Sequence, residues 1–125
     1  MTARRIQHVS VPTPDDRLEA CRAFYEHALG MRPIPNLAGI AWFELGDGDH
    51  VHLLSGEGLA THRSHFALEV DDLGSTLARC RAVGCEPAAQ RPLWGAPRWW
   101  VRDPAGNLVE LFDRSPPVSR PSPAG

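Results

Sequence analysis

The feature that most constrains this chain is an internal repeat within its 125 residues. Val51-His52-Leu53-Leu54 returns 58 residues later as Val109-Glu110-Leu111-Phe112. Gln7-His8-Val9-Ser10-Val11 returns 57 residues later as Ser64-His65-Phe66-Ala67-Leu68. Such a repeat predicts two copies of one structural unit, which bury more apolar surface together than either copy could alone.

Both copies are predicted to have the same order of elements. Each begins with an alternating strand (6–11 and 64–70), and an acidic pair then precedes an amphipathic helix (17–29 and about 73–83). Three short strands complete each copy. We therefore expect one α+β domain over residues 1–114, with module 1 at about 4–56 and module 2 at about 63–113. Residues 115–125 are rich in Pro and Ser, which predicts a disordered tail.

Strand alternation places four possible metal ligands on one face. In the first strand of each copy, apolar residues such as Val9 and Val11 lie on the face that suits a covering helix, and the histidine lies on the other. The last strand of each copy repeats this arrangement. All four candidates are therefore predicted to face away from the helices: His8, His52, His65 and Glu110.

Imidazole and carboxylate are ligands that divalent Mn, Fe, Co, Ni and Zn accept, so the four residues predict a site for one such ion. An octahedral ion would keep two open positions, which could hold waters or two adjacent oxygens of a small substrate. The ion could then polarise a carbonyl or activate a water molecule. If His52 does not bind, two histidines and a carboxylate remain, which is the set that suits Fe(II) and O₂.

Other residues share the predicted cavity face. Trp42, Trp100 and Arg98 predict an aromatic pocket with a cation for a substrate carboxylate or phosphate. Ordinary packing with a surface arginine is the alternative. Glu44 is a candidate general base, or else a solvated strand residue. His50 also lies on this face but nearer the turn, where we expect a rim residue.

These residues resemble a known family. The pattern is His8…Phe24-Tyr25-xxx-Leu29-Gly30…Val51-His52-Leu53…His65-Phe66-xxx-Val70-Asp71-Asp72…Asp103-Pro104-x-Gly106-Asn107-xx-Glu110-Leu111. It is similar to the vicinal oxygen chelate superfamily, which includes glyoxalase I, extradiol dioxygenases, fosfomycin-resistance enzymes and bleomycin-resistance proteins. The resemblance covers residues 4–113. It implies paired βαβββ modules, a U-shaped, mostly antiparallel eight-stranded sheet around a metal-containing cleft, and a homodimer.

By position, His8, His65 and Glu110 match the three ligands that recur in that family, and His52 matches the variable one. Differences between this chain and individual enzyme classes of that family argue against some of the family's functions. Glyoxalase I usually has a carboxylate where His52 stands, and fosfomycin enzymes use a lysine, whereas all 13 basic Lys/Arg residues here are Arg. Ring-cleaving dioxygenases usually have a cavity tyrosine, but the only tyrosine here, Tyr25, lies on the predicted helix.

We therefore expect lyase- or isomerase-type proton transfer, with Glu110 and Glu44 as the catalytic carboxylates. An extradiol-type dioxygenase and a non-catalytic protein that sequesters a drug or metabolite remain as alternatives. The sequence does not decide whether the site lies within one chain or is shared across a dimer.

The composition of the chain argues against some classes of binding partner. The formal net charge is −2 and there is no basic run, which argues against nucleic acid and anionic membranes as partners. No apolar run is long enough to span a bilayer. Three cysteines without a paired spacing, and no apolar leader, predict a cytoplasmic protein with reduced thiols. The expected partner is a small-molecule substrate.

Overall fold

The computed structural model describes residues 5–35, 41–56, 64–93 and 95–113, and it confirms the predicted α+β fold of two βαβββ modules. The predicted tail at 115–125 lies outside the described residues. Module 1 contains β1 (His8–Thr13), η1 (Asp15–Arg17), α1 (Leu18–Ala23), η2 (Phe24–Ala28), β2 (Arg32–Ile34), β3 (Trp42–Glu44) and β4 (His50–Ser55). Module 2 contains β5 (His65–Glu69), α2 (Leu73–Ala82), β6 (Ala88–Leu93), β7 (Ala96–Arg102) and β8 (Leu108–Phe112).

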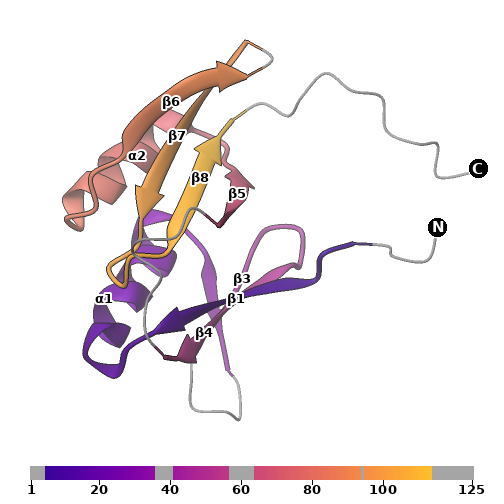
Figure 1. Ribbon diagram of the computed structural model, residues 1–125. Helices are drawn as coiled ribbons and strands as arrows, with labels where there is room; N and C mark the ends of the chain where they lie inside the picture. The colour runs from indigo at the N-terminus through magenta and orange to yellow at the C-terminus, as the bar shows by residue number, and fades with distance from the viewer. Residues whose placement is uncertain (1–4, 36–40, 57–63, 94, 114–125) are drawn as a thin grey trace, which may run out of the picture.

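Each module forms a mixed four-stranded sheet. The strand orders are β1-β4-β3-β2 and β5-β8-β7-β6, and in both sheets the first pair is parallel while the other pairs are antiparallel. Figure 1 shows the two sheets one above the other, with α1 and α2 on the same side of the molecule. The helices meet where Arg79 Nε donates to the carbonyl of Ala28 at 3.0 Å.

Strand register confirms that the modules are copies. In module 1, His52 lies opposite Trp42 on β3 and Ser10 on β1. In module 2, the equivalent Glu110 lies opposite Trp100 on β7 and Ala67 on β5. The alternation read from the sequence therefore puts His52 and Glu110 at the same place in each sheet.

The first helix differs from the single α-helix that the sequence predicts. α1 ends at Ala23 and continues as the π-helical turn η2, in which Leu29 N donates to Phe24 O at 3.0 Å. The wider turn buries Phe24, Tyr25 and Ala28 completely. The second helix begins as predicted, because the Asp72 carboxylate accepts a hydrogen bond from Ser75 N at 3.0 Å, which also lowers the pKa of Asp72. No described helix is long and apolar enough to cross a membrane.

A buried polar cluster joins the modules at the turn before β8. Tyr25 Oη donates to Asp103 Oδ2 at 2.7 Å, and Asn107 Nδ2 donates to the same oxygen and to Pro12 O, each at 2.9 Å. Asp103 Oδ1 accepts from Ala105 N and Asn107 N at 2.9 Å. The turn of module 2 is thereby fixed to the helix and first strand of module 1.

Candidate functional site

The module 1 half of the predicted site is a stack of rings around His52. His52 stacks on Trp42 with ring centroids 4.1 Å apart and on His8 at 4.4 Å. Since β4 lies between β1 and β3, the imidazole lies between these two neighbours. His52 is only 8% exposed, and this burial, followed by the neighbouring His8 and His50, lowers its pKa. A lowered pKa keeps the ring neutral, as a metal ligand must be.

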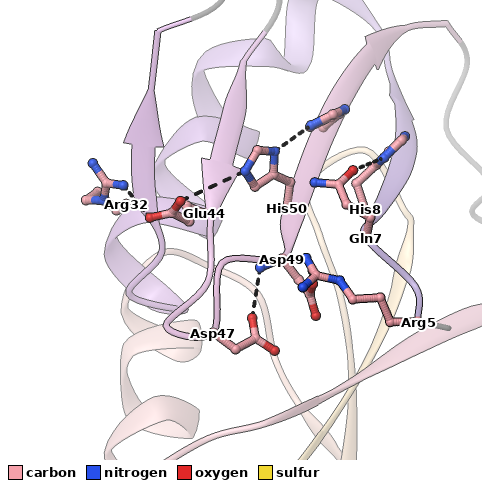
Figure 2. A network of polar contacts seen from close by, with 9 residues as sticks. Arg5, Gln7, His8, Arg32, Glu44, Asp47, Asp49 and His50 are labelled. Atoms are coloured by element: carbon pink, nitrogen blue, oxygen red, sulfur yellow. Dashed lines mark hydrogen bonds and ion pairs between the residues drawn. The ribbon is translucent and has the colours of Figure 1, made fainter.

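A row of polar residues also crosses this sheet, and it meets β4 at His50, two residues before His52. The register aligns Arg32 with Glu44, Glu44 with His50, and His50 with His8. Arg32 forms an ion pair with Glu44, and Glu44 Oε2 lies 4.0 Å from His50 Nε2 (Figure 2). His50 Nδ1 lies 3.2 Å from His52 Nε2. The sequence predicted His50 as a rim residue, and the structure places it between His52 and Glu44.

The module 2 half is centred on Glu110, whose side chain is buried. Its Oε1 accepts hydrogen bonds from Arg98 Nη1 at 2.7 Å and from Trp100 Nε1 at 2.9 Å. His65 Nε2 lies 3.5 Å from the same oxygen, and the His65 and Trp100 rings are 5.4 Å apart. The predicted ligand pair His65 and Glu110 is therefore together on one face, with Trp100 beside it.

Arg98 lies on the predicted face but has a partner that the sequence did not reveal. It pairs with Glu110 and also donates through Nε to the carbonyl of Arg91 at 2.9 Å. Charge-assisted hydrogen bonds of this kind fix the direction of a carboxylate. Glu110 is thus already oriented within the module, through one of its two oxygens.

The two ligand pairs do not form one metal-binding group in the chain. Within the part that the structure describes, no three His, Cys, Asp or Glu side chains are grouped as an ion would require. The donor types nevertheless suit a divalent ion of the Mn-to-Zn row. In each module the two predicted ligands lie close together, His8 stacked on His52 and His65 beside Glu110.

Comparison with known proteins identifies the family. A family model described as the Glyoxalase/Bleomycin resistance protein/Dioxygenase superfamily matches residues 5–111. The chain belongs to this superfamily. No curated protein is similar enough to the chain to count as a match.

Solved structures of the superfamily share the fold. A glyoxalase family protein from Bacillus anthracis is 26% identical, with a TM-score of 0.79 over 92% of this chain and 98% of that one. Lactoylglutathione lyase from Agrobacterium tumefaciens is 23% identical, with a TM-score of 0.69 over 90% and 96%. TnmS3, an antibiotic binding protein from Streptomyces sp. CB03234, is 22% identical, with a TM-score of 0.71 over 92% and 99%. The superfamily fold thus carries both enzymes and binding proteins.

Proposed function

We propose that this superfamily member is a divalent-metal-dependent enzyme that acts on a small substrate through two adjacent oxygens, by lyase- or isomerase-type proton transfer. The observation that carries the proposal is the matched position of His52 and Glu110, each opposite a tryptophan on the middle strand of its sheet. A repeat that preserves this placement while changing the donor from imidazole to carboxylate supports a mixed ligand set for one ion.

The residues that would hold the ion are His65 and Glu110 from module 2, and His52 and His8 from module 1. A bound divalent ion would act as a Lewis acid on a substrate carbonyl. Arg98 and Trp100 both donate to Glu110 Oε1, and Oε2 accepts none of the hydrogen bonds that the structure describes. Oε2 is therefore the oxygen that we assign to holding the ion or accepting a substrate proton.

The tryptophans supply the apolar walls of the proposed pocket. Trp42 stacks on His52 and Trp100 lies beside His65, so each would hold the apolar part of a substrate next to its module's ligands. Arg98 would keep Glu110 oriented and also offer positive charge to an acidic substrate group. Glu44, the second predicted catalytic carboxylate, pairs with Arg32 and lies 4.0 Å from His50, and we assign it to positioning His50.

We further propose that a homodimer assembles the complete site, with His52 and His8 of one chain facing His65 and Glu110 of the other. Two observations support this: the described residues of one chain form no group of three ligands, and β1 and β5 each end the strand order of their sheet. An edge strand offers unpaired backbone groups to a second chain.

Metal content tests the enzyme proposal directly. Protein purified without an affinity tag should contain a near-stoichiometric divalent metal that Glu110→Ala loses and Glu19→Ala, a change at an exposed carboxylate on α1, retains. Nickel, cobalt, manganese or zinc would support proton transfer, and iron would support the dioxygenase alternative. No metal in the wild type, even after reconstitution, would refute a metalloenzyme.

Mixing two inactive variants tests the shared site. His52→Ala and Glu110→Ala each damage a different half, so a mixed dimer would have one intact site and one site with both changes. Random exchange makes about half of the dimers mixed, and metal content should return to about one quarter of the wild-type value. Sites built within one chain would regain nothing.

A binding protein is the second candidate, because Arg98 already neutralises Glu110 without an ion. Under this alternative, the face that carries the two tryptophans sequesters an aromatic or acidic small molecule. Glu110→Ala should then change ligand affinity no more than the loss of one polar contact does, and added chelator should have no effect. A loss of ligand binding on chelation would exclude this alternative.

A further inference from the structure

We propose that His50 is itself a metal ligand, so that module 1 binds the ion with the pair His50 Nδ1 and His52 Nε2. This inference rests on the proposed function, because it concerns the same ion. It changes the ligand set, since His50 was expected only at the rim of the site.

The separation of the two nitrogen atoms is the first argument. His50 Nδ1 and His52 Nε2 lie 3.2 Å apart. Two nitrogens that are each about 2.1 Å from one ion, at an angle of roughly 90–110°, lie about 3.0–3.4 Å apart. The two imidazoles form a hydrogen bond at this distance, and an ion that replaced the shared proton would find the two nitrogens at the spacing of neighbouring ligands.

The second argument is that a carboxylate lies near the other nitrogen of the His50 ring. Its other nitrogen, Nε2, faces Glu44 Oε2 at 4.0 Å, and Arg32 pairs with the same carboxylate, as Figure 2 shows. Metal-binding histidines usually direct their second nitrogen to a carboxylate, which fixes the tautomer and orientation of the ring. Glu44 lies just beyond hydrogen-bonding distance of this nitrogen, and we assign it as the residue that would position the neutral His50 ring.

His8 is less well placed in this arrangement. Its ring is tilted by only 19° from that of His52, so the two rings stack face to face. Lone pairs of imidazole nitrogens lie in the ring plane, and near-parallel planes do not direct two lone pairs to one point. His8 can join the site only after its exposed side chain rotates away from the stack, whereas the His50 and His52 rings are tilted by 51° to one another and are not stacked.

The internal repeat provides a comparison within the same molecule. β1 aligns His8 with His50, and β5 aligns His65 with Leu108, so Leu108 is the module 2 counterpart of His50. Leu108 is buried in its sheet. The fold therefore accepts an apolar residue at this position, and backbone geometry alone does not account for a histidine on β4.

The test measures binding of Ni²⁺, and of Cu²⁺ as a spectroscopic probe, to the full-length, tag-free protein after chelation. His50→Leu copies the module 2 residue, and His50→Gln asks the same question with a polar side chain. Each should weaken Ni²⁺ binding at least about tenfold in calorimetry and remove one imidazole nitrogen from the Cu²⁺ resonance spectrum. Glu44→Gln should weaken binding about 10- to 100-fold with the nitrogen count unchanged. The control His27→Leu alters an exposed ring in η2 and should change neither quantity.

The outcomes separate this inference from the proposed function. If Glu110→Ala loses the ion while both His50 variants bind as the wild type does, the inference is overturned and the metalloenzyme proposal stands. If the His50 variants lose the ion while Glu110→Ala retains it, module 1 binds metal alone and the composite site is wrong. A wild type that binds neither ion overturns both.

Discussion

The hydrogen bond between Tyr25 and Asp103 should account for a large share of the coupling between the modules. Tyr25→Phe removes only the hydroxyl that donates to Asp103 Oδ2 at 2.7 Å, and the ring can keep its contacts with Phe24 and Phe43. Hydrogen bonds to charged groups contribute about 1.5–3 kcal/mol. Asp103 keeps three further donors from Ala105 and Asn107, so its carboxylate is not left without partners. We therefore expect Tyr25→Phe to lower the free energy of unfolding by about 1.5–3 kcal/mol and to leave the protein folded.

Urea denaturation of the four proteins in a double-mutant cycle measures this coupling. The cycle consists of the wild type, Tyr25→Phe, Asp103→Asn and the double variant, compared at one protein concentration because the proposed dimer would make stability concentration-dependent. Tyr25→Phe should lower the free energy of unfolding much less when Asp103→Asn is already present, and the coupling energy between the two changes should be about 1–2 kcal/mol. Effects that add within about 0.5 kcal/mol would refute the reasoning, because the two side chains would then act independently.

Three further predictions concern titration and reactivity. Burial, followed by the nearby Asp103, raises the pKa of Tyr25, the only tyrosine in the chain. Tyrosinate absorbance should therefore appear only on unfolding. The free energy of unfolding should fall above a pH of about 10, where the unfolded tyrosine ionises. Because the pKa of His52 is lowered in the folded protein, the unfolded state takes up a proton first on acidification. Denaturation of chelator-treated protein should therefore show a free energy of unfolding that falls below a pH of about 6.5. His52→Phe should make this dependence on pH less steep. Burial raises the pKa of Cys21 to about 12 and that of Cys80 to about 11, so at pH 8 both thiols should react with iodoacetamide only after denaturant is added.

The sequence was sufficient for the fold and for the pairs of predicted ligands that come together in each module, because both depend on periodicity. Strand alternation fixes which side a residue occupies, and the repeat fixes which residues are equivalent. The pairs Trp42 with His52 and Trp100 with Glu110 follow from these two facts once the strands align. The predicted α+β class is confirmed for the same reason.

Other features depend on contacts between distant segments, which a single sequence does not encode locally. The helix expected over 17–29 changes to a π-helical turn at Phe24, where its side chains enter a core shared with the second module. β6 runs to Leu93 through a register shift between Gln90 and Leu93, which strand alternation in the sequence does not reveal. The long side chain of Arg98 could point to substrate or to Glu110, and only tertiary structure decides between them.

The difference between the two copies is the strongest guide to how two chains would combine. One scaffold carries imidazoles at positions 8, 50 and 52, while the other carries a carboxylate held by Arg98 next to His65. A two-fold dimer can bring like halves together or unlike halves together twice. Like halves would collect imidazoles alone at one centre, and His65 and Glu110 from both chains at the other, so only one of the two centres would have both donor types. Unlike halves would give two identical centres of nitrogen and oxygen donors, which is the set that ions of the Mn-to-Zn row accept. The divergence of the copies therefore favours two equivalent sites, each made from module 1 of one chain and module 2 of the other.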